Sequence, residues 1–389
     1  MKQLLFLTRK SPFLTRNWGQ RRDQHLIRLL RETFEVEILC HAGASVGTRR
    51  TIADGIPTTE IVRPNSPLWR RPLSPLRPDI MKGYSDEMAA ALRMHASPGK
   101  LLWISTLLMG QYIPLARKLG FRVVLDEHHV ESGLMMDDAL SSLLNFPSIV
   151  AAAQCRYYES RLCKGSHALV ATSELDACRL QKLVPKMPIH VIPHLVDAQV
   201  FHELRQQPGK TLFFSGHLNS TSHLAGLEWF INEVLPRLRA HLGFRMPRVV
   251  IAGQSPPLRF VHKAEANGIE VVTQPDSSAI HLGDAAVAFF PMLTHIGPNM
   301  KILEAMAAGR PVVSTGKAAE GLMISPSYDI LVANSAEHFT TSILKLLEDR
   351  ELREAITRNA LQTIEARHDW QCARPRLEEL VRSVDEMGE

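Results

Sequence analysis

The sequence has few aromatic residues and no long apolar run. Aromatic residues make up 6% of the 389 residues. Neither an RNA-binding signature nor a zinc-finger spacing is present, so we predict no nucleic-acid partner. The longest apolar runs, such as residues 101–110, are far shorter than the ~20 residues that a transmembrane helix needs. Residues 4–7 form too short an apolar run for a secretory signal, and they are predicted to be a first strand.

Cysteine is equally sparse. The chain has five cysteines, with no C-x-x-C pair and no histidines at zinc-ligand spacing. This pattern argues against a structural zinc site and favours a reduced, cytoplasmic protein. The five positions are Cys40, Cys155, Cys163, Cys178 and Cys372.

Positive charge is present in excess, and it is concentrated near the start of the chain. The formal net charge is +5, and the first hundred residues hold about 17 Lys and Arg against about 9 Asp and Glu. Such a surface attracts anions. Residues 63–79 are rich in proline and arginine around Trp69, so we expect a long loop there. We interpret it as a contact with an acceptor or with the anionic inner face of a membrane through Arg70, Arg71 and Arg77. A solvated loop that covers a domain edge is the open alternative.

Two successive α/β halves can be read along the chain, because short apolar strands alternate with helical patterns. We place the boundary after residue 203, where residues 205–210 are polar and contain Pro and Gly. This predicts an N-terminal domain at 1–203, a C-terminal domain at 204–370 and a final helix at 371–389. Strands are expected at 3–8, 36–40, 101–106, 122–125, 168–172, 189–193, 211–215, 249–252, 271–273, 286–290 and 311–314, and helices at 112–118, 149–163, 224–241, 300–308, 336–368 and 372–387.

Residues 297–315 are the most informative stretch. Gly297 and Pro298 close a loop, a helix is predicted at 300–308, Gly309 ends it, and a short β-branched strand follows. The start of a helix in such a unit binds anions readily. Lys301 and Glu304, three residues apart, share one face of its first turn. A cation and a carboxylate in that place suit a ligand with both phosphate and sugar hydroxyl groups.

This stretch resembles the donor-site motif of GT-B glycosyltransferases, specifically the retaining family 4. A common form reads G-T-R-L-K-I-L-E-A-M-A, then G-x-P-V-V-S-T and E-G-L, and the last element corresponds to Glu320 and the two residues after it. The resemblance implies an α/β GT-B fold, with two Rossmann-like domains that face a central cleft and a last helix that crosses back to the first domain. It also implies that Glu304 binds the nucleotide ribose and that Lys301 contacts the diphosphate.

A second motif joins a strand to a loop dense in titratable groups, at residues 122–132. It resembles the D-x-H-N-V-E-S segment of the family, with His128 in the histidine position and His129 in the asparagine position. In an open α/β sheet, ligands bind beyond the carboxyl ends of the strands, where His128 falls. The resemblance implies that His128 contacts the transferred sugar. A plain surface role for both imidazoles is the alternative.

The remaining candidate residues carry weaker signals. Gly19, in the expected first strand-to-helix loop, would let the backbone approach an acceptor or the diphosphate. The loop after the 211–215 strand offers hydroxyl, amide and imidazole donors but no Arg or Lys, so Lys301 and the helix start must carry most of the diphosphate. The donor set is completed by Gly216, His217, Asn219, Gln274, Gly297, Asn299 and Glu320, and the acceptor set consists of Gly19, Arg21, Arg22 and His129.

No D-x-D motif is present, and the resemblance implies transfer without a metal or other cofactor from a nucleotide sugar such as a UDP- or GDP-sugar. We therefore predict a retaining hexosyltransferase of polysaccharide biosynthesis that acts on a glycan, lipid-linked or small-molecule acceptor. No carboxylate is well placed for a double displacement, which favours front-face attack. Two alternatives stay open: a GT-B sugar-nucleotide epimerase, and a catalytically weak GT-B subunit that binds a glycan or a protein partner. Ile296 and Asn299, which depart from the motif, favour the second alternative.

Overall fold

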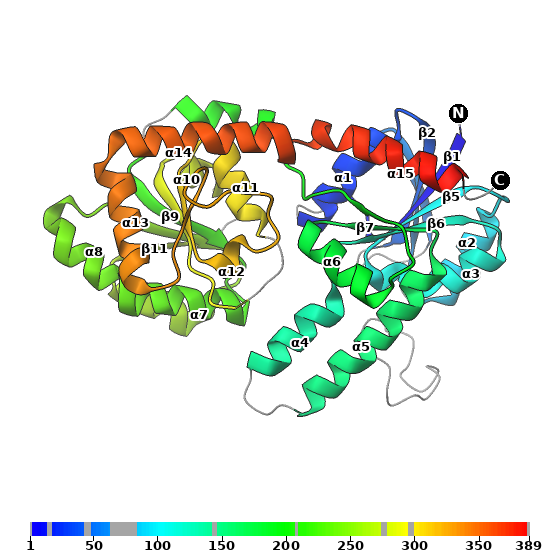
Figure 1. Ribbon diagram of the computed structural model, residues 1–389, viewed down its shortest axis with the longest axis horizontal. Coiled ribbons are helices and arrows are strands. Elements are labelled where there is room, and N and C mark those ends of the chain that lie inside the picture. The colour runs from blue at the N-terminus through cyan, green and yellow to red at the C-terminus, as the bar shows by residue number, and fades with distance from the viewer. Residues whose placement is uncertain are drawn as a thin grey trace. The chain divides into compact units, whose positions relative to one another are not determined.

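The computed structural model describes residues 2–13, 18–42, 48–62, 84–141, 146–206, 209–273, 278–294 and 299–386. The chain forms two compact units. The first comprises Met1–Leu195 together with Ala373–Glu389, and the second is Val196–Cys372. The division therefore falls eight residues before the predicted boundary, because the segment after Leu195 packs with the second unit. Both units are layered α/β structures with helices on their sheets (Figure 1).

The first unit is built on a sheet of eight strands in the order β3-β4-β2-β1-β5-β6-β7-β8. All neighbours pair in parallel except β3 and β4, which form an antiparallel pair at the edge. The central strands are apolar and fully buried, which is typical of a parallel sheet covered on both faces. The strands are β1 Lys2–Lys10, β2 Phe34–His41, β3 Arg49–Ala53, β4 Ile56–Ile61, β5 Leu101–Ser105, β6 Arg122–Glu127, β7 Ala168–Ala171 and β8 Ile189–Val191.

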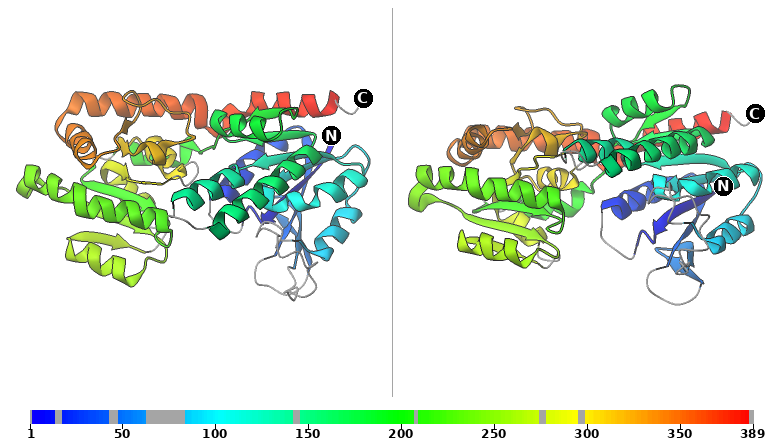
Figure 2. Two further views of the ribbon diagram at one scale, coloured as in Figure 1. Left: turned by 60° about the horizontal axis from the view of Figure 1, so that its bottom comes forward. Right: turned by 90° about the horizontal axis from the view of Figure 1, so that it is seen from below.

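The helices of the first unit include one that the sequence pattern did not predict. Residues 131–141 form α4, which packs against the long helix α5 as a helical hairpin (Figure 2). The last helix of the chain, α15, also belongs to this unit, where Asp385 pairs with Lys2 at 2.6 Å and with Arg122 at 2.9 Å. The helices are α1 Trp18–Leu30, α2 Asp86–Met94, α3 Ile113–Lys118, α4 Glu131–Ser141, α5 Phe146–Gly165, α6 Glu174–Leu183 and α15 Arg374–Glu386.

The second unit has a parallel sheet of six strands in the order β11-β10-β9-β12-β13-β14. A π-helical segment at Phe230–Val234 joins α7 and α8 within the single helix that was predicted. The predicted helix at 336–368 is instead two helices, because Asp349 leaves the helical conformation and caps α14 with its side chain. The strands are β9 Thr211–Gly216, β10 Arg248–Gly253, β11 Ile269–Val272, β12 Ala285–Phe290, β13 Val312–Ser314 and β14 Leu331–Val332. The helices are α7 Thr221–Trp229, α8 Leu235–Leu242, α9 Leu258–Ala266, α10 Ser278–Gly283, α11 Met300–Ala307, α12 Gly316–Ala319, α13 Ala336–Glu348 and α14 Arg350–Thr363.

Candidate active site

Polar residues gather at the carboxyl ends of the central strands of the first sheet. Ser105 ends β5 and lies directly opposite Asp126 of β6. Because parallel strands end at the same edge, these residues and His128, two residues later, share one end of the sheet. The backbone is strained here as well: Thr106 has φ of +73°, which a β-branched residue rarely adopts. Such strain is concentrated at functional sites.

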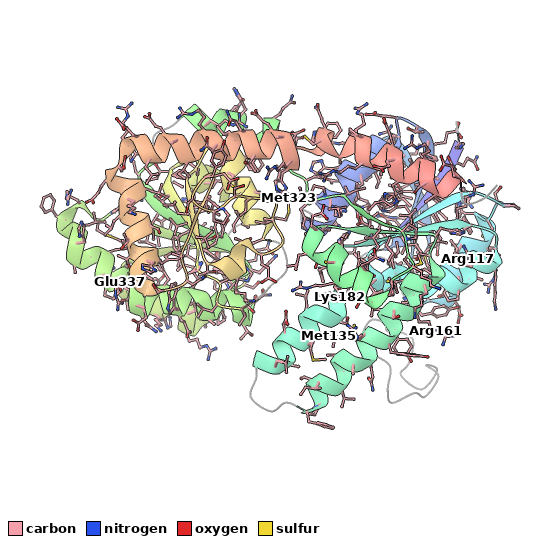
Figure 3. All side chains as sticks on the ribbon, in the orientation of Figure 1. Arg117, Met135, Arg161, Lys182, Met323 and Glu337 are labelled. Atoms are coloured by element: carbon pink, nitrogen blue, oxygen red, sulfur yellow. The ribbon has the colours of Figure 1, made fainter. Side chains whose placement is uncertain are left out.

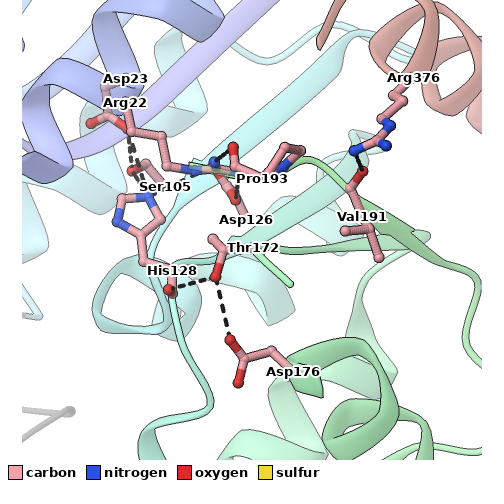
Figure 4. Close-up of polar contacts among 10 residues, drawn as sticks. All are labelled: Arg22, Asp23, Ser105, Asp126, His128, Thr172, Asp176, Val191, Pro193 and Arg376. Atoms are coloured by element: carbon pink, nitrogen blue, oxygen red, sulfur yellow. Dashed lines mark hydrogen bonds and ion pairs between the residues drawn. The ribbon is translucent and has the colours of Figure 1, made fainter. Parts of the chain in front are cut away.

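Arg22 of α1 forms a buried ion pair with Asp126. Its Nε and Nη2 donate to the two carboxylate oxygens at 3.1 and 2.9 Å, and its Nη1 donates to the carbonyl of Pro193 at 2.7 Å (Figure 4). The side chains are 1% and 0% exposed. Burial alone would raise the pKa of Asp126, but Arg22 and His128 together hold it below its usual range. Arg22 was predicted to contact an acceptor, whereas its guanidinium is buried and bonded within the protein, so the acceptor role stays an untested prediction.

His128 lies beside this pair and is itself buried. Its Nε2 is 3.3 Å from Ser105 Oγ, 3.6 Å from Asp126 Oδ2 and 3.8 Å from Asp23 Oδ1. Its backbone carbonyl accepts a hydrogen bond from Thr172 Oγ1 at 3.1 Å (Figure 4). The Nε2 edge of the imidazole thus faces two carboxylates. The hydrogen bond from Thr172 anchors the backbone of His128 to the end of β7, so both the ring and its backbone are fixed in position.

Asp23 is the residue of this group that sequence reasoning missed. Its two carboxylate oxygens accept hydrogen bonds from Ser105 Oγ at 2.6 Å and from Thr8 Oγ1 at 2.7 Å. Burial raises its pKa, while His128 and the two hydroxyls oppose that rise. The sequence offered one sign of this polar cluster: Thr8 and Ser105 are polar residues that each follow an apolar run at a strand end.

The other acceptor candidates are Gly19, Arg21 and His129, which lie in the first turn of α1 or just before the start of α4. His129 Nε2 pairs with Glu131 Oε1 at 3.0 Å. Burial lowers the pKa of His129, but Glu131 more than offsets this and leaves the pKa raised. Gly19 and Arg21 lie in the first turn of α1. The prediction that Gly19 belongs to the loop before this helix is therefore wrong.

In the second unit, α11 begins where the motif predicts it. The side chain of Asn299 caps the helix by accepting from the Lys301 amide at 3.1 Å, and Lys301 Nζ lies 2.8 Å from Glu304 Oε2. The two paired side chains are 34% and 12% exposed. Gly309 ends the helix with φ of +67°, the left-handed conformation expected at that place. A cation, a carboxylate and a capped helix start thus meet at one partly open position.

The turn after β9 lies close enough to Lys301 for the two to interact. Partial desolvation and then the charge of Lys301 both lower the pKa of His217. Gly216 precedes it, and a Cβ there would lie 2.7 Å from His223 Cδ2, so no larger residue fits without a shift. Burial, with a smaller contribution from His217, lowers the pKa of His223 to about 4.

The remaining donor candidates are less well connected to this group. Asn219 is exposed in the turn between β9 and α7, and Glu320 pairs with Lys317 at 3.1 Å after α12. Gln274, Gly297 and the loop at 63–79 lie outside the described residues.

The described part of the chain lacks two features. No group of three or more His, Cys, Asp or Glu side chains is placed there to hold a metal ion. None of its helices combines the length and the apolar character needed to cross a bilayer. Transfer without a metal and a cytoplasmic location stay predictions.

Comparison with known proteins supports the GT-B resemblance. Residues 209–349 match the family described as "Glycosyl transferases group 1". An uncharacterised 44.6 kDa protein from the cps region of Klebsiella pneumoniae is 26% identical over 165 residues, which cover 41% of this chain and 42% of that protein. The chain thus spans less than half the length of this curated relative.

Solved structures match the whole chain. Sucrose-phosphate synthase from Thermosynechococcus elongatus superimposes with a TM-score of 0.76 at 13% identity, covering 100% of both chains. An Escherichia coli trehalose-6-phosphate protein bound with UDP-2-fluoro glucose gives 0.70 at 11% identity, covering 99% of each chain. Anabaena HepE in complex with UDP and glucose gives 0.66 at 13% identity, covering 98% of this chain and 100% of that one. The chain therefore has the GT-B fold, and residues 209–349 of its second unit match the glycosyltransferase group 1 family. Membership of family 4 stays a prediction.

Proposed function

We propose that the protein is a retaining glycosyltransferase that moves a hexosyl group from a UDP-sugar to a glycan, lipid-linked or small-molecule acceptor. The observation that carries the proposal is the start of α11, where Lys301, Glu304 and the cap of Asn299 meet within the glycosyltransferase domain. Two similar structures, the Escherichia coli protein and HepE, were solved with a UDP-sugar analogue and with UDP and glucose, which favours UDP as the nucleotide.

The chemistry of this group suits a nucleoside diphosphate. The amides of the first turn of α11 and the ammonium of Lys301 attract phosphate oxygens. Glu304 is 12% exposed, and its carboxylate can accept hydrogen bonds from the two ribose hydroxyls. Desolvation and Lys301 lower the pKa of His217, which favours the neutral imidazole with its one N–H donor.

Transfer would need little more than charge stabilisation and positioning. As the sugar leaves, negative charge develops on the diphosphate, where Lys301 and the helix start are preorganised to stabilise it. We assign His128 to the sugar, because it is held rigidly at the edge where ligands of parallel sheets bind. Front-face attack, with the leaving phosphate taking the acceptor proton, fits this set of residues. A similar structure from trehalose-6-phosphate synthase was solved to study glycosyl transfer with retention.

Calorimetry with UDP tests the donor site. Glu304→Gln should weaken UDP binding by about 1–3 kcal/mol, because it replaces charged hydrogen bonds to ribose by neutral ones. Glu337→Gln, at an exposed position of α13, is the matched control and should bind as the wild type does. Figure 3 labels Glu337. Unchanged UDP affinity in Glu304→Gln would remove this residue from the site.

Donor hydrolysis separates an enzyme from a binding subunit. A transferase releases sugar slowly from its UDP-sugar to water, whereas a subunit that only binds should not. The anomeric form of the first sugar released, followed by NMR, also reports stereochemistry. Release with inverted configuration would contradict the retaining assignment.

A further inference from the structure

Helices α3 and α5 of the first unit pack together and present a joint outer surface. A Cβ on Gly165 of α5 would lie 2.9 Å from Ile113 of α3, and one on Gly110, just before α3, would lie 3.3 Å from Leu162. The two helices therefore approach closely near the carboxyl end of α5. Figure 3 shows Arg117 of α3 and Arg161 of α5 on the same side of this unit.

The charge of this surface has one sign. The structure describes every backbone position of α3 and α5, and across the two helices the sole carboxylate is that of Glu159, which is 0% exposed. Every charged side chain that these helices expose is therefore a cation. They are Arg117, Lys118, Arg156, Arg161 and Lys164.

Apolar and aromatic side chains continue the same face of α5. Positions 146, 149, 150, 153, 156, 157, 160, 161 and 164 follow the spacing of one helical stripe. Its amino-terminal half is apolar, with Phe146 72% exposed, and its carboxyl-terminal half places Tyr157, 62% exposed, among the cations. Leu140 at the end of α4 is 68% exposed. We call this stripe, with Arg117 and Lys118, the α5 surface.

We propose that the α5 surface binds the protein to an anionic phospholipid membrane, with α5 lying along the lipid interface. The cations of this stripe can contact anionic headgroups, while the exposed Phe146 and Tyr157 beside them can enter the lipid interface. Tyrosine suits that interface because its ring is apolar and its hydroxyl is polar. A soluble polyanion would use the cations alone and would leave Phe146 and Leu140 in water. The exposed Asp137 lies on α4 and not on the α5 stripe.

This inference goes beyond the proposed function, because membrane binding can be measured without any transferase activity. It also replaces a prediction that the structure does not test. The loop at 63–79 was the sequence-based candidate for a membrane contact, whereas the α5 surface consists of described residues. A lipid-linked acceptor would then be reached from the membrane on which the enzyme sits.

Co-sedimentation with vesicles tests the proposal. The full-length protein should pellet with vesicles of phosphatidylcholine and phosphatidylglycerol in equal parts, stay in solution with phosphatidylcholine alone, and dissociate as salt rises. Each cation near an anionic leaflet raises partitioning about fivefold, so Arg156→Gln, Arg161→Gln and Lys164→Gln together should lower it roughly a hundredfold. Tyr157→Ala and Phe146→Ser should lower it further at unchanged charge.

A matched control removes three exposed cations elsewhere: Arg237→Gln, Arg239→Gln and Arg259→Gln, all in the second unit. This variant has the same net charge as the α5 variant and should still pellet, and thermal unfolding checks that both are folded. Equal loss in the two triple variants would show attraction by net charge and would overturn the proposal. So would a wild type that ignores anionic vesicles. Binding to RNA or dextran sulfate as tight as to vesicles, with no effect of Tyr157→Ala or Phe146→Ser, would mean a polyanion partner and would also overturn it.

Discussion

Each unit contains an ion pair near its candidate site, and the two pairs differ in how far they are exposed to solvent. In the first unit, Arg22 and Asp126 are 1% and 0% exposed, and a carbonyl satisfies a further guanidinium N–H. In the second, Lys301 and Glu304 are 34% and 12% exposed and lie three residues apart on one helix. The first pair is closed, because its members have no surface for another partner. The second is partly open, so a ligand can replace the contact that Lys301 and Glu304 make with each other.

This difference separates structural roles from binding roles. A buried ion pair stabilises little by itself, but removing one member leaves an uncompensated charge in a medium of low polarity. A partly exposed pair contributes at most about 1 kcal/mol and can be broken by a ligand at small cost. The charged groups around His128 should therefore control folding and geometry, while those at α11 should control affinity.

The largest effect is expected for Arg22→Met. Asp126 would be left buried without its cation, and we expect a loss of about 3–5 kcal/mol in the free energy of unfolding, measured with urea. Lys301→Met should cost less than about 1 kcal/mol in the same assay. Replacing both Arg22 and Asp126 by Met should recover much of the loss. Equal stability of Arg22→Met and Lys301→Met would contradict the structural role assigned to the buried pair.

A second prediction concerns two more buried carboxylates in the first unit. Burial raises the pKa of Glu159 to about 7, although Ser132 donates to it, and burial and Glu159 raise the pKa of Glu127 well above its usual value. For Glu159 the folded state holds the proton more tightly than the unfolded state, whose pKa is near 4.5. Stability from this group is therefore present below about pH 4.5 and is lost as pH rises toward 7.

Glu159→Gln removes that titration and keeps an acceptor for Ser132. The free energy of unfolding of this variant, measured with urea, should rise relative to that of the wild type by about 3 kcal/mol between pH 4.5 and pH 8. This follows from about 1.4 kcal/mol per pKa unit. Glu354→Gln, at an exposed site of α14, serves as the control and should show no such growth. A constant difference across the range would mean that Glu159 is ionised in the folded protein.

The third prediction separates catalysis from nucleotide binding. His128→Ala should lower turnover tenfold or more, which corresponds to about 1.4 kcal/mol of barrier per tenfold, while UDP affinity barely changes. His129→Ala should have a smaller effect, because that imidazole is paired with Glu131. If His129→Ala lost turnover and His128→Ala did not, the roles of the two residues would be exchanged.

The smallest effect is expected for Ser105→Ala. Its hydroxyl lies 2.6 Å from Asp23 and 3.3 Å from His128, so we expect it to act by positioning the imidazole. We expect turnover to fall about fivefold, near 1 kcal/mol for one hydrogen bond, and the pH profile of turnover to shift. Ser105→Thr should restore most of both. A fall in turnover with an unchanged pH profile would indicate a packing role alone.

Much of the fold could be predicted because its signals are local. Apolar β-branched runs mark the strands of both sheets, and the capped start and glycine end of α11 lie within ten residues of each other. Features with weak local signals were missed. The edge strands β3 and β4 and the helix α4 were not predicted, and the single helix expected at 336–368 is divided at Asp349.

The candidate site was predicted unevenly for the same reason. Lys301 and Glu304 are one turn apart, so helical spacing alone brings them together. Arg22 and Asp126 are 104 positions apart, and sequence pattern gives no sign of their pairing. Arg22 was therefore assigned to the acceptor surface, and Asp23 was overlooked.

The sequence by itself determined the alternation of strands and helices, the parallel sheets that follow from it, and the capped start of α11, because each depends on neighbours a few residues away. Only the tertiary structure decided which charged groups are buried and paired and which face water. The reason is physical: the cost of burying a charge depends on everything packed around it, and around His128 those groups come from α1, β1, β5 and β6 together.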